Sequence, residues 1–199
     1  MQTLFHMDNP FWRFMGKLTD LVVITILWFI CCLPIFTIGA STTALYDVSM
    51  KLQQDKDGYT LKNFFTSFKK NFKQSTLIWL VLLAVGILIA GDIWFLSQLK
   101  SSGTNLLLFM LFLLTFFCLI LTIYLFPLIA RYETTLKNIF IMAFVLSLKN
   151  FSWSILMLTT IICFILVSLF VSAPVILISA GGTAYIHAKI LCPIFLKLK

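Results

Sequence analysis

Three long, predominantly apolar stretches constrain this chain more than any other feature of its sequence. They run from Leu77 to Leu96, from Leu106 to Ala130 and from Ser154 to Leu169. A helix needs about 20 apolar residues to cross the hydrocarbon core of a bilayer. Only 11% of the 199 residues are charged, whereas a soluble domain carries about 25% charged residues. The sequence therefore predicts one all-α integral membrane domain over residues 1–199.

Three further segments are candidate membrane spans. Phe11 to Leu33 is long enough if its two basic residues reach back to the membrane surface. Ile35 to Lys51 and Val175 to Leu191 have 17 residues each, at the short end of the range. Counting all of them gives a polytopic helical bundle of six spans in three hairpins. The alternative is five spans, with Phe11 to Gly39 as one span that leads directly into the lysine-rich loop.

The distribution of basic residues favours six spans. Lys and Arg in short loops concentrate on the cytoplasmic side of a membrane. With six spans, fourteen of the fifteen basic residues lie inside and only Lys100 lies outside, whereas five spans give twelve to three. We therefore predict a multi-pass cell-membrane protein with cytoplasmic N- and C-termini. This topology and the lipid bilayer account for the net charge of +8, so nucleic acid is not predicted as a partner.

The segment from Leu33 to Tyr46 predicts a tight helical hairpin. Pro34 ends the first helix, because proline lacks an N–H donor, and its fixed φ suits the first turn of the next. The small residues that follow allow another helix to approach closely, which is how membrane helices associate. Pro174 to Ala184 matches Pro34 to Ala44 at five of eleven positions. The predicted helix-packing and partner-contact residues are Pro34, Gly39, Ala40, Thr43, Ala44, Pro174, Ala180, Gly181 and Gly182.

An amphipathic helix is predicted from Leu61 to Lys73. Its phenylalanines fall within one third of a helical wheel and its lysines occupy the adjoining third. Such a helix lies in the membrane interface, with its aromatic rings below the headgroups and its lysines toward anionic lipid. The predicted membrane-surface residues are Phe64, Phe65, Phe68, Lys69, Lys70, Phe72 and Lys73.

Ionisable residues within spans are the first candidates for function in a membrane protein. Asp20 is expected to form a local ion pair near the inner surface, and Asp92 to lie at the outer interface. Asp47 and His187 each follow the proline of a predicted hairpin by thirteen residues. They would meet if the two hairpins pack about a local two-fold axis, and Asp47, Asp92 and His187 would then line a polar path. The alternative is that Asp47 and His187 are interfacial residues that do not touch.

No pattern typical of an enzyme active site is present in the sequence. There is no nucleophile and base pair, H-E-x-x-H motif, P-loop or paired carboxylate. The five cysteines lie in apolar runs without the spacing of zinc ligands. Gly181 and Gly182 also lie in an apolar run, which indicates packing glycines. We therefore predict no enzymatic activity, no cofactor and no metal site.

A set of short motifs extends along nearly the whole chain. Its members are Asp20-Leu21, Leu27-Trp28, Cys32-Leu33-Pro34-Ile35, Thr37-Ile38-Gly39-Ala40, Thr43-Ala44-Leu45-Tyr46, Phe64, Phe68-Lys69, Asn71-Phe72-Lys73, Pro127-Leu128, Ala130-Arg131-Tyr132 and Leu136-Lys137-Asn138. Together these motifs resemble the YesL-like family of bacterial integral membrane proteins, which is classed as a domain of unknown function. Two positions depart from that family's pattern: Thr25 replaces an asparagine found in many relatives, and Gly39-Ala40-Ser41 replaces Gly-Pro-Ala.

The resemblance implies a role in oligosaccharide uptake, because many YesL-like proteins are encoded with carbohydrate ABC importers and glycan-degrading enzymes in Gram-positive bacteria. We therefore expect a non-enzymatic accessory or regulatory membrane protein that binds the permease subunits of a carbohydrate ABC importer. The alternative is a small stand-alone membrane transporter or lipid-interacting protein.

Overall fold

The computed structural model describes residues 10–54, 59–98, 104–170 and 176–196, and the regular structure within these residues is helical throughout. The predicted all-α class is confirmed. In chain order the elements are α1 (Pro10–Cys32), η1 (Ile35–Thr37), α2 (Ile38–Gln53), α3 (Thr60–Gln98), α4 (Thr104–Arg131), α5 (Leu136–Lys149), α6 (Phe151–Phe170) and α7 (Ile176–Leu196).

Pro34 lies between two helices, where the sequence predicts a turn. α1 ends at Cys32, and the short 3-10 helix η1 separates Pro34 from α2. Thr37 closes this turn, because its hydroxyl and its backbone N–H both donate to the Pro34 carbonyl oxygen, at 2.6 and 2.9 Å. Pro34 therefore starts the 3-10 turn and does not occupy the first turn of α2.

α2 lies at the centre of the fold and packs against α1, α3, α4 and α7. Eleven of its sixteen residues are buried. The buried hydroxyls of Ser41, Thr43 and Ser49 donate to carbonyl oxygens one turn back in the chain, at 2.7 to 3.0 Å. This satisfies polar groups that would otherwise be costly in an apolar interior. Within the segment predicted as a short span, the residues of α2 are therefore mostly covered by neighbouring helices, whereas Ile35 and Phe36 are 65% and 51% exposed.

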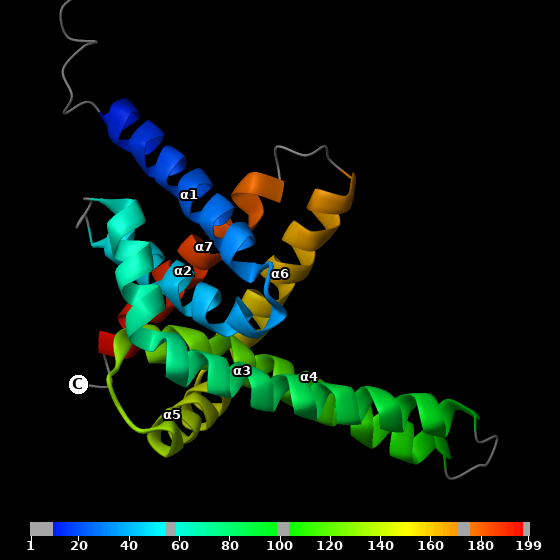
Figure 1. Ribbon diagram of the computed structural model, residues 1–199. Coiled ribbons are helices and arrows are strands. Elements are labelled where there is room, and N and C mark those ends of the chain that lie inside the picture. The colour runs from blue at the N-terminus through cyan, green and yellow to red at the C-terminus, as the bar shows by residue number, and fades with distance from the viewer. Residues whose placement is uncertain (1–9, 55–58, 99–103, 171–175, 197–199) are drawn as a thin grey trace, which may run out of the picture.

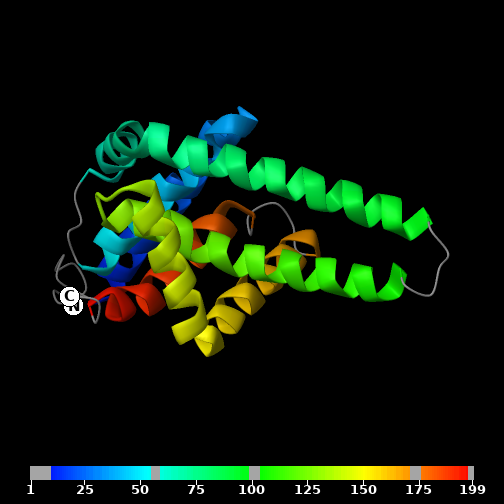
Figure 2. The ribbon, with the colours of Figure 1, turned by 90° about the horizontal axis from the view of Figure 1, so that it is seen from below.

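α3 and α4 form a hairpin that reaches well beyond the other helices (Figures 1 and 2). At 1.5 Å per residue, the 39 residues of α3 have a contour length of roughly 58 Å, which exceeds the ~30 Å hydrocarbon core of a bilayer. We call residues 82–98 and 104–122 the α3–α4 arm. The arm exposes large apolar side chains such as Leu88, Phe109 and Phe112, which are 68%, 56% and 66% exposed. Such a surface requires lipid or another protein chain to cover it.

Within the described residues, three helices are long and apolar enough to cross a membrane: Met15–Cys32 of α1, α3 and α4. A fourth candidate is the pair α5 and α6, whose axes bend by 96° between Lys149 and Phe151. The membrane class is supported, and three or four of the described helices qualify as spans by length and composition. The six spans in three hairpins stay a prediction. The predicted corner at Pro174 lies outside the described residues.

Five helix termini lie on the same side of the molecule. The start of α1, the end of α2, the start of α3, the end of α4 and the end of α7 all lie opposite the tip of the arm (Figures 1 and 2). Lys51 in the last turn of α2 and Arg131 at the end of α4 are therefore on this side. The basic residues thus concentrate away from the arm tip.

The amphipathic segment Leu61–Lys73 forms the first turns of α3 and not a separate helix, because no Gly or Pro interrupts the chain before the apolar run. These first turns run in a different direction from the arm (Figure 1). Phe64 is fully buried and Phe68 packs half-buried against the core, whereas Phe65 is 44% exposed. The phenylalanine stripe therefore packs largely on the bundle, while the lysines of the segment are exposed.

Candidate functional site

Two glycines of the predicted small-residue segments bring helices of this chain into close contact. At Gly39, an added Cβ atom would lie 2.5 Å from the Ser75 carbonyl oxygen of α3 and 2.6 Å from the Trp79 Cβ. At Gly181, an added Cβ would lie 2.6 Å from the Leu21 carbonyl oxygen of α1. No side chain fits at these distances from a backbone atom. The two glycines thus pack α2 on α3 and α7 on α1.

Hydrogen bonds between helices accompany both close contacts. The Thr43 hydroxyl of α2 lies 2.8 Å from that of Ser75 on α3. The hydroxyl of Thr25, one of the positions that depart from the YesL-like pattern, donates to Leu21 at 2.7 Å and accepts the Gly181 N–H at 2.9 Å. Each glycine contact is therefore fixed in register by a neighbouring threonine.

Because helices of this chain pack against the predicted small residues, most of these residues are not available for contact with a partner. Ala40, Thr43 and Ala44 have no exposed surface. A partner helix would have to displace α3 or α7 to reach them, so a partner surface must lie elsewhere. Of the other predicted residues, Pro34 is exposed, Ala180 and Gly182 are half-buried, and Pro174 lies outside the described part of the chain.

His187 is fully buried and joins three helices through its two ring nitrogens. Nδ1 lies 2.9 Å from the Tyr46 hydroxyl on α2, and Nε2 lies 2.9 Å from the Thr160 hydroxyl on α6. Thr160 donates its hydroxyl proton to the Met157 carbonyl oxygen at 2.7 Å, so its oxygen accepts a proton from Nε2–H. Nδ1 then accepts from Tyr46. The arrangement suits a neutral imidazole.

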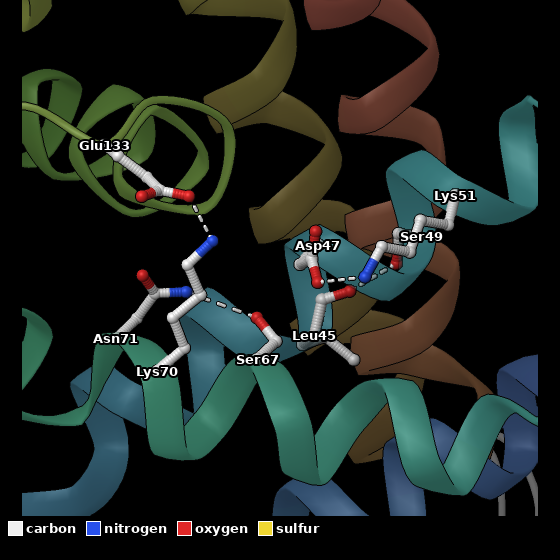
Figure 3. A network of polar contacts seen from close by, with 8 residues as sticks. All are labelled: Leu45, Asp47, Ser49, Lys51, Ser67, Lys70, Asn71 and Glu133. Atoms are coloured by element: carbon white, nitrogen blue, oxygen red, sulfur yellow. Dashed lines mark hydrogen bonds and ion pairs between the residues drawn. The ribbon is translucent and has the colours of Figure 1, made fainter.

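The three residues of the predicted polar path lie in different environments. Asp47 forms an ion pair with Lys51 on its own helix, with 2.7 Å between Oδ2 and Nζ (Figure 3). His187 instead contacts Tyr46, the residue before Asp47. Asp92 is exposed on the α3–α4 arm. Among the described residues no hydrogen bond or ion pair links these three side chains, which agrees with the alternative that Asp47 and His187 do not touch.

A second ion pair links one exposed lysine of α3 to a glutamate that follows α4. Lys70 reaches across to Glu133, which follows α4 (Figure 3). The two side chains are 55% and 77% exposed, and exposed pairs of this kind contribute about 1 kcal/mol or less. Gln74 adds a hydrogen bond from α3 to the Thr134 carbonyl oxygen at 3.0 Å. These contacts orient the polar ends of the helices and form no catalytic constellation.

A groove on the α3–α4 arm combines large apolar side chains with a group of small ones. It has a volume of about 430 Å³, and its small residues are Gly86 and Ala90 from α3 and Thr115, Cys118 and Thr122 from α4. Both threonine hydroxyls donate within their own helix at 2.8 Å. The groove is therefore apolar, with small residues on both helices.

Gly86 differs from Gly39 and Gly181 in having open space beside it. An added Cβ at Gly86 would meet no atom within 4 Å. Gly86 and Ala90 are not among the packing residues predicted above. Their spacing of four residues, Gly-Ile-Leu-Ile-Ala, is nevertheless the small-residue signal typical of close helix contacts in membranes.

A further cavity of about 450 Å³ lies between α1, α2, α6 and α7. Its walls are mostly apolar and include Trp28, Phe164 and Tyr46. The Trp28 indole N–H donates to the Thr42 hydroxyl at 3.2 Å beside it. Through Tyr46 the cavity adjoins the buried His187.

No curated protein and no solved structure matches the chain. Over residues 21–93 the chain is similar to a family described as "Protein of unknown function, DUF624". The matched region extends from the middle of α1 through α2 into the arm.

Proposed function

We propose that this protein is a non-enzymatic accessory protein of the cell membrane that binds another integral membrane protein through the groove of the α3–α4 arm. One observation carries the proposal. Gly39 and Gly181 are already filled by helices of this chain, whereas the space beside Gly86 is open. The YesL-like resemblance makes a permease subunit of a carbohydrate ABC importer the expected partner.

A transmembrane helix is the occupant that suits this groove. Helices associate in lipid by close packing of small residues, since lipid tails are as apolar as leucine. Gly86 and Ala90 on one wall and Thr115 and Cys118 on the other would allow the backbone of a second helix to approach. Larger exposed side chains, such as Ile87 at 63% exposure, would pack against its flanks.

In this proposal the arm crosses the bilayer and both termini are cytoplasmic. The basic first turns of α3 then lie at the inner surface, where each lysine near anionic lipid contributes about 1 kcal/mol. The support is the excess of basic residues on one side in the sequence and the gathering of helix ends opposite the arm tip (Figure 2).

Gly86→Leu should release the partner without affecting the fold. A tagged copy purified from native membranes in mild detergent is expected to recover permease subunits, and Gly86→Leu should reduce that recovery at least about tenfold, because a close helix contact tolerates no large side chain. Gly91→Leu is the matched control, since an added Cβ there also meets nothing within 4 Å and Gly91 is outside the groove.

Two results would contradict this function. The wild-type protein would be recovered without any permease subunit, or Gly91→Leu would lose the partner as fully as Gly86→Leu. The melting temperatures of the purified variants, compared with that of the wild type, establish that each variant is folded.

The cavity beside Tyr46 favours a second candidate, a small stand-alone transporter or lipid-interacting protein. Its volume of about 450 Å³ falls within the range of small-molecule sites. This candidate predicts that the purified protein in liposomes moves a solute or a proton and that substitution of His187 abolishes the movement. Gly86→Leu would leave such transport unchanged, which distinguishes the two functions.

A further inference from the structure

The bend between α5 and α6, here called the elbow, borders a pocket. The residues that line it include none from the arm and none of Tyr46, Thr160 and His187. α5 ends at Lys149, and Asn150 closes the elbow by donating its N–H to the Leu146 carbonyl oxygen at 3.0 Å. The pocket between this elbow and α7 has a volume of about 460 Å³. It lies beside the 96° bend between these two helices, which together are a candidate membrane span.

α5 has the surface expected of a helix that lies along a membrane. Its inner face is buried on the bundle at Ile139 and Ala143, both at 0% exposure. Its outer face exposes Ile141, Phe144 and Val145, at 61%, 47% and 50%. If α6 enters the bilayer, the 96° bend directs α5 along the surface, and the elbow lies near the headgroups.

The pocket is basic and has no acidic counterpart. Lys149 and Lys189 line it from α5 and α7. No acidic side chain among the described residues forms an ion pair with either, and in the sequence no Asp or Glu follows Glu133 although five lysines do. Trp153, 48% exposed, lines the same pocket, and tryptophan is the residue most typical of membrane interfaces.

Apart from Asn150, the rest of the lining is apolar. It includes Leu146 from α5 and Ile190 and Ile194 from α7. One ligand class combines a negative head with an apolar tail at the depth of a membrane interface. Basic pockets between membrane helices bind such lipid headgroups elsewhere.

We propose that the elbow pocket is a binding site for one anionic phospholipid. Its phosphate lies between the ammonium groups of Lys149 and Lys189, and its glycerol and first acyl segment pack on Trp153 and Ile190. The lipid ties α5 and α7 together at the membrane surface. This site is independent of the partner proposed for the arm.

The test uses the full-length protein, delipidated in mild detergent, and native mass spectrometry with added phosphatidylglycerol or phosphatidylcholine of identical acyl chains. Two lysines near the phosphate imply that the first phosphatidylglycerol binds about 30-fold more tightly than phosphatidylcholine. Lys149→Gln/Lys189→Gln should remove this preference. Lys62→Gln/Lys69→Gln, which neutralises two exposed lysines of α3, should retain it.

Three outcomes would overturn the proposal. Equal affinity of the wild-type protein for the two lipids would remove the need for a charged site. An equal loss in the two double variants would assign the preference to diffuse surface charge. Displacement of phosphatidylglycerol by inorganic phosphate alone would identify a site for a free anion, because such a site would not need the acyl chain.

Discussion

Gly39→Ala is expected to lower the free energy of unfolding by about 3 kcal/mol, at the upper end of the usual cost of overpacking a core. The added Cβ would lie 2.5 Å from the Ser75 carbonyl oxygen. That atom belongs to the backbone of α3 and cannot rotate away, so α2 must move off α3. Unfolding of the protein in mixed micelles by titration with SDS, followed by circular dichroism, measures the change.

The control for this prediction is the same substitution where the structure has room. Gly86→Ala and Gly91→Ala place a methyl group where nothing lies within 4 Å, and alanine is favoured over glycine inside a helix by roughly 0.5 to 1 kcal/mol. These variants should therefore be slightly more stable than the wild type. If Gly39→Ala is as stable as they are, α2 does not pack on α3 as described.

His187→Leu is expected to cost about 2 to 3 kcal/mol of stability, because it leaves the buried Tyr46 hydroxyl without its partner. Leucine fills most of the same volume, so the loss comes mainly from the hydrogen bonds. The same SDS titration measures it.

A double-mutant cycle separates the hydrogen bond from packing. Tyr46→Phe removes the hydroxyl that His187→Leu leaves unpaired. The double variant should therefore lose about 1 kcal/mol less stability than the sum of the losses in the two single variants. Interhelical hydrogen bonds in membranes reach coupling energies of about this size. Additive losses would mean that Tyr46 and His187 do not interact.

Helix positions could be predicted because they depend on local chemistry. The apolar stretches from Leu77 and from Leu106 lie within α3 and α4, and the stretch from Ser154 lies within α6. Pro34 falls between α1 and α2 because proline cannot continue the helix before it. These outcomes require only the properties of neighbouring residues.

The neighbours of each helix could not be predicted in the same way. An apolar side chain can face either lipid or protein in a membrane, so periodicity does not distinguish Phe64, which is buried, from Phe65, which is 44% exposed. For the same reason the burial of eleven of the sixteen residues of α2 could not be anticipated. Composition alone likewise does not distinguish a short span from a short helix packed among others.

For His187, the similarity of the two proline segments predicts a contact partner that is one residue away from the observed one. Matching the two prolines pairs His187 with Asp47, whereas the structure pairs it with Tyr46. Successive side chains on an α-helix point about 100° apart. Tyr46 is therefore buried, while Asp47 lies beside Lys51. Thr160, on α6, carries no sequence signal that would link it to either residue.

The central position of α2 has a consequence for biogenesis. Four of the described helices separate α2 from α7 in the chain, yet the two pack together, and Gln53 of α2 donates to the Tyr185 carbonyl oxygen of α7 at 3.3 Å. With sixteen residues and buried hydroxyls along its length, α2 is poorly suited to waiting alone in lipid. We therefore expect α2 to reach its final packing only after α7 has been synthesised.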